Sequence, residues 1–228
     1  MNNDKLFHTV AADEQELMLG LWNRLEGLGY TIVAEADKQH SIQYVFGIPT
    51  RQSTTVMCVA HCDTIIRKDG VELMLDPSGN ILTNAKGVLG ADDRAGVACI
   101  MEAIEDYGHR PYVLFTTGEE SGGTGVKAFV ADRHLDDHLD RVNFFIEIDR
   151  QGSDDYVYYS DVLPQAIHAW AKKHGWTEAN GSYSDVADLT SHYGIPHINV
   201  SAGYYNQHGK NEKLHIAVRY LVPRQIEE

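Results

Sequence analysis

The chain has 228 residues, of which 43% are hydrophobic and 23% are charged, and its formal net charge is −14 at pH 7. This length and apolar content exclude an acidic disordered tail and predict a single globular domain spanning 1–228. The negative charge repels nucleic-acid phosphates and anionic lipids, so we expect neither nucleic acid nor a membrane as a partner.

Apolar periodicity and turn residues predict alternating helices and strands. The predicted elements, in chain order, are a helix at 13–28, extended segments at 30–34, 42–46 and 54–60, a hairpin at 71–75 and 80–83, a helix at 95–107, a strand at 112–116, a helix at 123–130, a strand at 142–149, a helix near 163–174, a strand at 195–201 and a helix near 214–221. The segment 54–60 is almost uniformly apolar, which is typical of a central strand covered on both faces. The alternation predicts an α/β fold, a three-layer α/β/α sandwich with a mixed, mostly parallel sheet in which the hairpin supplies antiparallel pairing.

The cysteine content and the N-terminal residues predict the cellular compartment. The sequence has no apolar run of about 18 residues, and its first residues lack the basic-then-apolar order of a signal peptide. Cys58, Cys62 and Cys99 are odd in number and lie in apolar runs, which predicts buried free thiols. We therefore expect a cytoplasmic protein without a disulfide framework, whose oligomeric state the sequence leaves open.

Acidic and imidazole side chains gather where predicted strands end. They are His61 and Asp63 after the strand at 54–60, Asp92 and Asp93 before the helix at 95–107, Glu119 and Glu120 after the strand at 112–116, Asp149 at the end of the strand at 142–149, and His208 after the strand at 195–201. Because the carboxyl ends of parallel strands meet at one edge of a sheet, we expect these side chains to share a crevice. Acids so close together repel one another unless cations lie among them.

Imidazoles and carboxylates without thiolates suit zinc, and manganese or cobalt are also compatible with them. Such a set can hold two divalent ions that share a water molecule. A carboxylate that is not a ligand can then move the proton of that water. Adjacent Glu119 and Glu120 can divide the roles of base and ligand, because neighbouring residues in a tight turn point in different directions.

Five motifs, taken in their order along the chain, carry a family resemblance. They are Ala60-His61-Cys62-Asp63-Thr64, Leu89-Gly90-Ala91-Asp92-Asp93-Arg94-Ala95-Gly96, Phe115-Thr116-Thr117-Gly118-Glu119-Glu120-Ser121-Gly122, Asp149, and Tyr205-Asn206-Gln207-His208-Gly209-Lys210. With this order the chain resembles the co-catalytic zinc exopeptidases, a superfamily that includes peptidase T, other dinuclear aminopeptidases, and related acylases and carboxypeptidases. The resemblance extends from about residue 54 to residue 208.

The resemblance implies a role for each matching residue. It makes Asp92 the carboxylate that bridges two metal ions, His61 and Asp149 the ligands of one ion, and Glu120 and His208 the ligands of the other. It makes Glu119 the general base and Asp63 the carboxylate that orients the imidazole of His61. It also implies a cis peptide bond between Asp92 and Asp93.

Some of these assignments have competitors. Glu147 competes with Asp149, since residues two apart in a strand share a face, and the position of Asp149 nearer the carboxyl end favours Asp149. His215 is close enough in sequence to His208 to replace it as a ligand. Further expectations concern a solvated acidic segment around His134 and His138, a packing role for Cys62, and cleft positions for Tyr183, Ser184, Asp185, Tyr204, Tyr205 and Asn206.

The chain departs from its lidded relatives in one respect. Peptidase T and its closest relatives insert a lid or dimerisation domain between the acid that matches Asp149 and the last histidine, whereas only 58 residues separate Asp149 from His208. We therefore expect no lid, and no lid-borne arginine and histidine to clamp a substrate carboxylate.

The resemblance implies a dinuclear zinc hydrolase that acts like an aminopeptidase on the terminal amide bond of a small peptide or aminoacyl substrate. A carboxypeptidase or an N-acyl-amino-acid deacylase on the same metal core is one alternative. The alternative of another class is a catalytically inactive, metal-stabilised binding protein.

Overall fold

The parallel strands place their carboxyl ends at one edge of a central sheet. The computed structural model describes residues 3–36, 41–51, 54–65, 70–160 and 164–218. Within these residues the central sheet has eight strands in the order β1-β2-β6-β3-β7-β10-β8-β9. They are β1 (Tyr30–Ala36), β2 (Ile42–Pro49), β3 (Val56–His61), β6 (Tyr112–Thr116), β7 (Phe144–Arg150), β8 (Asp155–Val157), β9 (Thr177–Glu178) and β10 (His197–Ser201). Strands β6, β3, β7 and β10 are parallel neighbours. Strand β2 pairs antiparallel with β1 and β6, and β8 pairs antiparallel with β10 and parallel with β9.

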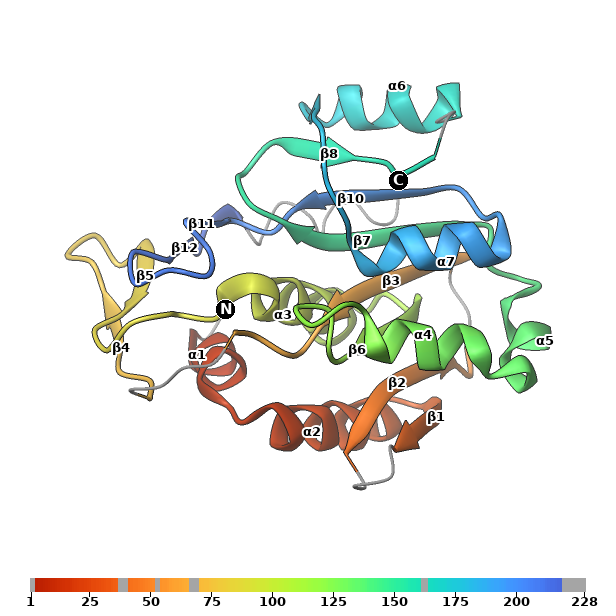
Figure 1. The fold of residues 1–228 in the computed structure, drawn as a ribbon, viewed down its shortest axis with the longest axis horizontal. Helices are drawn as coiled ribbons and strands as arrows, with labels where there is room; N and C mark the ends of the chain where they lie inside the picture. Colours follow the sequence, from red (N-terminus) through yellow and green to blue (C-terminus); the bar gives the residue numbers. More distant parts are fainter. Residues whose placement is uncertain (1–2, 37–40, 52–53, 66–69, 161–163, 219–228) are drawn as a thin grey trace.

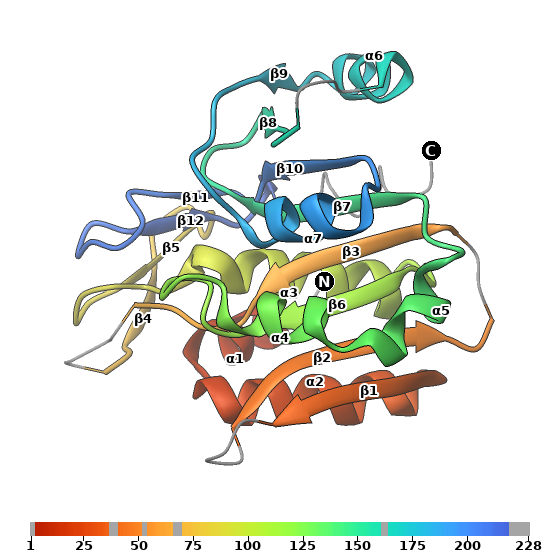
Figure 2. The same ribbon diagram turned by 45° about the vertical axis from the view of Figure 1, so that its right-hand side comes forward.

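Helices cover both faces of this sheet, as Figures 1 and 2 show. They are α1 (Asn3–Ala11), α2 (Glu14–Gly27), α3 (Ala91–Glu105), α4 (Thr124–Ala131), α5 (Asp136–Leu139), α6 (Gln165–Lys173) and α7 (Asp185–Tyr193). Helices α1, α2 and α3 pack on one face, and α4 and α7 pack on the other. The predicted three-layer α/β/α sandwich is therefore confirmed.

Strand β3 shows why the sheet is buried on both faces. Its side chains alternate, so that Cys58 and Ala60 join the core beneath α1 to α3, whereas Met57 and Val59 join the core beneath α4 and α7. All four are fully buried. The predicted central position of this strand is confirmed, and the three cysteines are buried free thiols as expected.

Two predicted elements differ in the structure. The hairpin forms, but its strands β4 (Leu73–Leu75) and β5 (Ile81–Asn84) belong to a separate four-stranded sheet with β11 (Tyr204–Tyr205) and β12 (Lys213–His215), in the order β11-β12-β5-β4 within the described residues. The C-terminal helix predicted near 214–221 is wrong at its start, because Leu214 is buried in β12, where it pairs with Leu82 of β5. Positions 219–221 lie outside the described residues.

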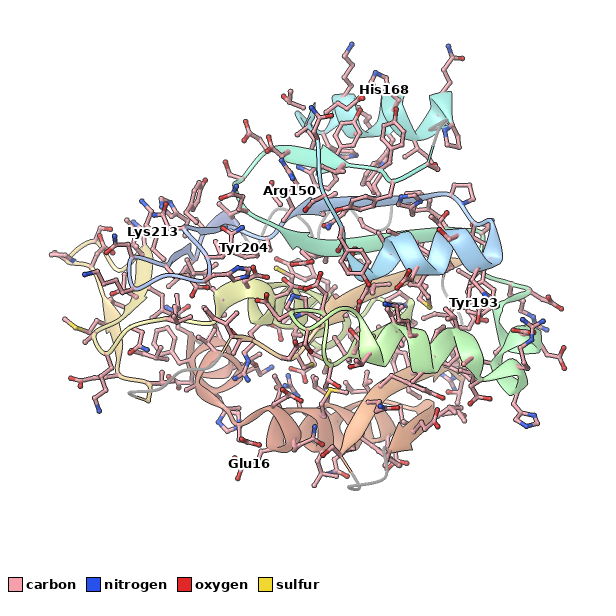
Figure 3. All side chains as sticks on the ribbon, viewed as in Figure 1. Glu16, Arg150, His168, Tyr193, Tyr204 and Lys213 are labelled. Atoms are coloured by element: carbon pink, nitrogen blue, oxygen red, sulfur yellow. The ribbon has the colours of Figure 1, made fainter. Side chains whose placement is uncertain are left out.

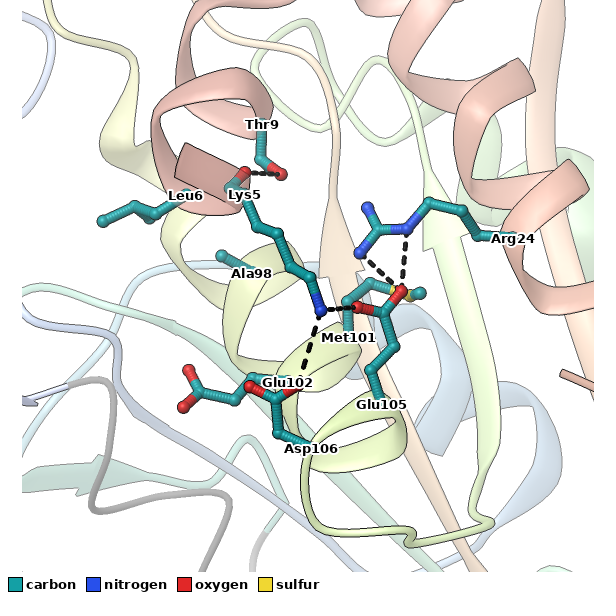
Figure 4. A pocket seen from close by; sticks show the side chains of 9 residues that line it. All are labelled: Lys5, Leu6, Thr9, Arg24, Ala98, Met101, Glu102, Glu105 and Asp106. Atoms are coloured by element: carbon teal, nitrogen blue, oxygen red, sulfur yellow. Dashed lines mark hydrogen bonds and ion pairs between the residues drawn. The ribbon is translucent and has the colours of Figure 1, made fainter. Parts of the chain in front are cut away.

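Ion pairs hold α1 and α2 against α3. Glu105, near the C-terminal end of α3, accepts hydrogen bonds from Lys5 Nζ at 2.7 Å and from Arg24 Nε at 2.9 Å (Figure 4). At the other end of α3, the buried guanidinium of Arg94 donates to the carbonyl oxygens of Val10 and Cys62, both at 3.2 Å. Of the helices in the described part of the chain, none is long and apolar enough to cross a membrane.

Candidate metal centre

The sheet edge brings together all five side chains expected to bind metal. His61 ends β3, Asp149 lies near the end of β7, Asp92 opens α3, Glu120 follows β6, and His208 lies between β11 and β12. They form two groups, in each of which one ligand atom per residue lies within 4.8 Å of the others: His61, Asp92 and Asp149 in the first, and Asp92, Glu120 and His208 in the second. Among the described residues, His134 and His138 belong to no such group.

Asp92 belongs to both groups because its two oxygens face different imidazoles. Its Oδ1 lies 3.2 Å from Nε2 of His61, and its Oδ2 lies 3.1 Å from Nε2 of His208. The peptide bond from Asp92 to Asp93 is cis, as expected. Gly90 precedes the helix in the left-handed region, with φ of 73°. One carboxylate thus lies between two sets of potential ligands.

Asp63 orients His61 and also holds the turn that carries the paired glutamates. The Nδ1 of His61 lies 3.1 Å from the carbonyl oxygen of Asp63 and 3.3 Å from its Oδ1. The carboxylate of Asp63 accepts the backbone N–H groups of Glu119 at 3.2 Å and Glu120 at 3.1 Å. With Nδ1 donating, Nε2 of His61 keeps its lone pair; this atom is buried and makes no hydrogen bond.

A bulge in β7 presents Asp149 to the site. Glu147 pairs with Asn199 of β10, and the next pair is Arg150 with Ser201. Strand β7 thus advances by three residues where β10 advances by two, and the register shifts around Asp149. The side chain of Asn199 replaces the missing ladder partner. Its Oδ1 accepts the N–H of Asp149 and its Nδ2 donates to the carbonyl of Asp149, both at 3.0 Å.

The carboxylate of Asp149 is held on both oxygens. The hydroxyl of Tyr204 donates to Oδ1 at 3.0 Å, and Oγ of Ser184 donates to Oδ2 at 2.9 Å. Oδ1 of Asp149 lies 3.6 Å from Nε2 of His61. The competitor Glu147 is fully buried, contacts the same hydroxyl oxygen of Ser184, and lies outside both groups. The geometry therefore favours Asp149 over Glu147.

The second group stands at the rim of the site. Nε2 of His208 lies 2.8 Å from Oε1 of Glu120, and the side chain of His208 is 48% exposed. Glu119 belongs to neither group, and its Oε2 lies 3.9 Å from Nε2 of His61. His215, the alternative to His208, packs its ring against Tyr205 and is in neither group.

The site holds more carboxylates than its two imidazoles can neutralise. Burial and the neighbouring carboxylates raise the pKa of Glu119 to about 8 and that of Glu120 to about 7. Although burial opposes ionisation of Asp92, hydrogen bonds from His208 and His61 lower the pKa of its carboxyl. The same contact with Asp92 raises the pKa of His208 to about 9. Divalent cations compensate such an excess of negative charge.

Comparison with known proteins identifies the family. Residues 44–209 match the family model of peptidase family M28. The chain belongs to this family. Aminopeptidase PepT from Bacillus cereus has a similar structure, with a TM-score of 0.76 and 16% identity over 98% of this chain and 95% of that one. A tripeptidase from Staphylococcus aureus gives a TM-score of 0.73 and 14% identity over 98% of this chain and 94% of that one. At these identities the two structures show the shared fold alone.

One curated relative is more similar in sequence over a shorter segment. The uncharacterized protein YqjE of Bacillus subtilis is 36% identical over 86 residues, which are 35% of this chain and 23% of that protein. The chain thus matches less than a quarter of the length of this relative. The family match agrees with the resemblance to co-catalytic zinc exopeptidases expected from the five motifs.

Two residues that support the site of this M28 chain escape a reading of the sequence. Asn199 holds the backbone of Asp149, and the buried carboxylate of Glu212 accepts the backbone N–H of Asp92 at 3.2 Å. Each of these two residues has a feature in the sequence that could have pointed to it. Asn199 is a polar residue within an apolar strand, and Glu212 follows His208 by four positions.

The cleft beside the metal centre has polar walls. Tyr183 and Tyr204 line it, as expected, together with Arg150, Gln207 and Asn180. Arg150 and Tyr204 both lie at the edge where β7 and β10 end, as Figure 3 shows. The guanidinium of Arg150 is paired with Asp155 at 3.0 Å.

The remaining cleft candidates lie elsewhere. Ser184 and Asp185 are fully buried behind the cleft, and Tyr205 and Asn206 do not line it. Cys62 is buried in the core, in keeping with a packing role.

Proposed function

We propose that this M28 chain is a dinuclear zinc aminopeptidase that removes the N-terminal residue of short peptides. The observation that carries the proposal is the position of Asp92, whose two oxygens face two separate sets of ligands. The residues fit zinc, because each set offers one imidazole and two carboxylates and contains no thiolate. The buried Nε2 of His61 makes no hydrogen bond, so its lone pair is available to a zinc ion.

We assign His61, Asp92 and Asp149 to one ion, and Asp92, Glu120 and His208 to the other. When bound, the two ions would supply Lewis-acid polarisation of the scissile carbonyl and a more acidic water molecule. Asp63 fixes the imidazole of His61 so that Nε2 points to the site, and it holds the backbone of the turn that presents Glu119 and Glu120.

Glu119 is assigned as the general base. Its carboxylate lines the cleft, is not needed in either ligand set, and lies close to His61. It takes a proton from the attacking water and returns that proton to the departing amine nitrogen of the substrate. The backbone hydrogen bond to Asp63 keeps the turn in place while the side chain moves the proton.

The lining of the cleft bears on which end of the substrate is held. Its wall carries the carboxylates of Asp92, Glu119, Glu120 and Asp149, and the guanidinium of Arg150 is paired with Asp155. A guanidinium that is already paired attracts a substrate carboxylate less than a free cation does, and this favours a substrate held by its amino end. Two proteins of similar structure, an aminopeptidase and a tripeptidase, point the same way. We further propose one catalytic domain without an inserted lid, since β8, α6, β9, α7 and β10 account for the segment between Asp149 and His208.

Hydrolysis of matched substrates tests the proposal. Zinc-loaded protein is expected to cleave tripeptides and aminoacyl anilides, but not the same compounds with an acetylated N-terminus. Glu119→Gln is expected to lower kcat by about 10²- to 10⁴-fold while the protein still binds two zinc ions. Glu16→Gln, at an exposed position on α2, is the matched control and should keep full activity.

Other outcomes point to other functions. Preference for N-acyl amino acids would identify a deacylase, and release of C-terminal residues would identify a carboxypeptidase. Zinc binding without hydrolysis of any of these compounds would contradict the enzyme assignment and favour a metal-stabilised binding protein.

A further inference from the structure

The buried carboxylate of Glu212 joins the two segments that carry Asp92 and His208. Glu212 lies between β11 and β12, four positions after His208, and it contacts the segment that leads into α3. It is 1% exposed. Its Oε2 accepts the backbone N–H groups of Leu89 and Gly90, each at 2.9 Å. Its Oε1 accepts those of Ala91 at 2.8 Å and Asp92 at 3.2 Å.

Four consecutive amides therefore converge on one side chain. Gly90 makes this possible, because its left-handed φ of 73° turns the chain into the helix. Asp92 and Asp93 have non-helical backbone angles, so these four amides precede the regular part of α3 and take no part in its hydrogen-bond ladder. Such N–H groups need an acceptor outside the helix. A carboxylate supplies two oxygens, each of which can accept two hydrogen bonds.

This contact fixes the distance between two candidate ligands that are remote in sequence. Oδ2 of Asp92 lies 3.1 Å from Nε2 of His208, although the two residues belong to separate elements. His208 is 48% exposed and its φ is 63°, a conformation that costs energy for a residue with a side chain.

We propose that Glu212 is a positioning residue for the second metal ion, the one assigned to Asp92, Glu120 and His208. The inference rests on the proposed function. Only this second group takes two of its three ligands from the segments that Glu212 joins, whereas His61 and Asp149 are held by Asp63, Asn199, Ser184 and Tyr204. Loss of Glu212 is therefore expected to weaken the second ion more than the first.

Zinc titration of the metal-free protein tests this. The wild type is expected to bind two zinc ions. Glu212→Gln keeps the shape of the side chain but replaces one oxygen with an NH₂ group that faces N–H donors. It should weaken the second ion by about 10- to 100-fold, as loss of partners that orient metal ligands generally does, with a smaller effect on the first. Excess zinc should restore hydrolysis, and the zinc-activation curve should shift by the same factor.

Glu105→Gln is the matched control. Glu105 is near the opposite end of the same helix and accepts hydrogen bonds from Lys5 and Arg24, so its replacement should lower Tm but leave both zinc affinities unchanged. If Glu212→Gln does not fold, Glu212→Asp provides the comparison. It keeps the charge, but its shorter side chain cannot reach all four amides, so a selective loss at the second ion is again expected.

The inference would be overturned by unchanged binding of the second ion in the folded variant, or by equal weakening of both ions. A wild type that binds fewer than two zinc ions would overturn it as well. A wild type that binds two ions and hydrolyses no peptide would contradict only the proposed function.

Discussion

The bulge that presents Asp149 allows a quantitative test of how the chain holds a candidate ligand. Asn199 is 2% exposed, and its carboxamide makes three hydrogen bonds of 3.0 Å, two with the backbone of Asp149 and one with Oγ of Ser184. Asn199→Ala would leave the N–H and the carbonyl of Asp149 buried without these partners. No ladder partner replaces them, because the register shifts at this position.

The expected loss follows from those two backbone groups. A buried polar group that loses its partner costs about 1–3 kcal/mol, so we expect Asn199→Ala to lower the free energy of unfolding by about 2–4 kcal/mol. For a domain of this size that loss corresponds to a fall of about 5–15 °C in Tm. Zinc binding at the group of His61, Asp92 and Asp149 should weaken in the same variant.

Thermal unfolding of the metal-free protein, followed by circular dichroism, measures the stability loss without any assumption about the ions. Asn80→Ala is the matched control, since Asn80 is exposed and its side chain donates one hydrogen bond of 3.1 Å to Ser78. It should change stability by less than about 0.5 kcal/mol. If Asn199→Ala lowered Tm no more than this control does, the reasoning about the bulge would be refuted.

Three further predictions concern packing, pH and metal. Gly96→Ala should lower the free energy of unfolding by about 1–3 kcal/mol or more in urea titrations, because its methyl group would overlap the carbonyl oxygen of Ile148 in β7. Gly20→Ala on α2, where a methyl group meets no atom within 4 Å, should instead stabilise by up to about 1 kcal/mol; equal effects would contradict this account. Burial lowers the pKa of His197, whose Nε2 accepts the N–H of Tyr159 at 2.7 Å, to about 4. The unfolded chain therefore binds the proton first, so the stability that neutral His197 provides should be complete above about pH 6.5 and decline as the pH falls toward 4. In His197→Gln, Tm should fall less between pH 6.5 and pH 4 than it does in the wild type. An equal fall in both proteins would contradict a lowered pKa of His197. Chelation of the zinc-loaded protein should lower Tm, because the carboxylates then repel one another without the ions. Added zinc should restore Tm in a concentration-dependent way. If neither treatment changed Tm, the result would count against a metal centre.

Elements with strong local patterns could be predicted from the sequence. The uniformly apolar run that forms β3 identified the centre of the sheet. The polar residues at strand ends identified the crevice, because parallel strands necessarily bring their carboxyl ends to one edge. For that reason His61, Asp92, Glu120, Asp149 and His208 could be placed together although they are dispersed along the chain.

Elements that depend on distant partners could not be predicted. Helix α1 is short, and it is held by the guanidinium of Arg94 and the ion pair of Lys5 with Glu105 rather than by its own propensity. Helix α7 was missed because few of its side chains, Val186 and Leu189 among them, are buried apolar residues. The segment at Leu214 has an apolar pattern compatible with a helix, and only pairing with β5 makes it a strand.

The sequence by itself therefore determined the architecture and the crevice in which the candidate site lies, since periodicity and the polarity of strand ends are local properties; the choice of ligands within that crevice came from the family resemblance. Tertiary structure alone decided how those ligands are held. Whether Glu147 or Asp149 enters the site depends on a bulge, and the joining of Asp92 to the loop of His208 depends on a contact between Glu212 and four amides. Both are long-range hydrogen-bonding arrangements, which form only when remote segments are already packed together and leave little trace in the order of residues.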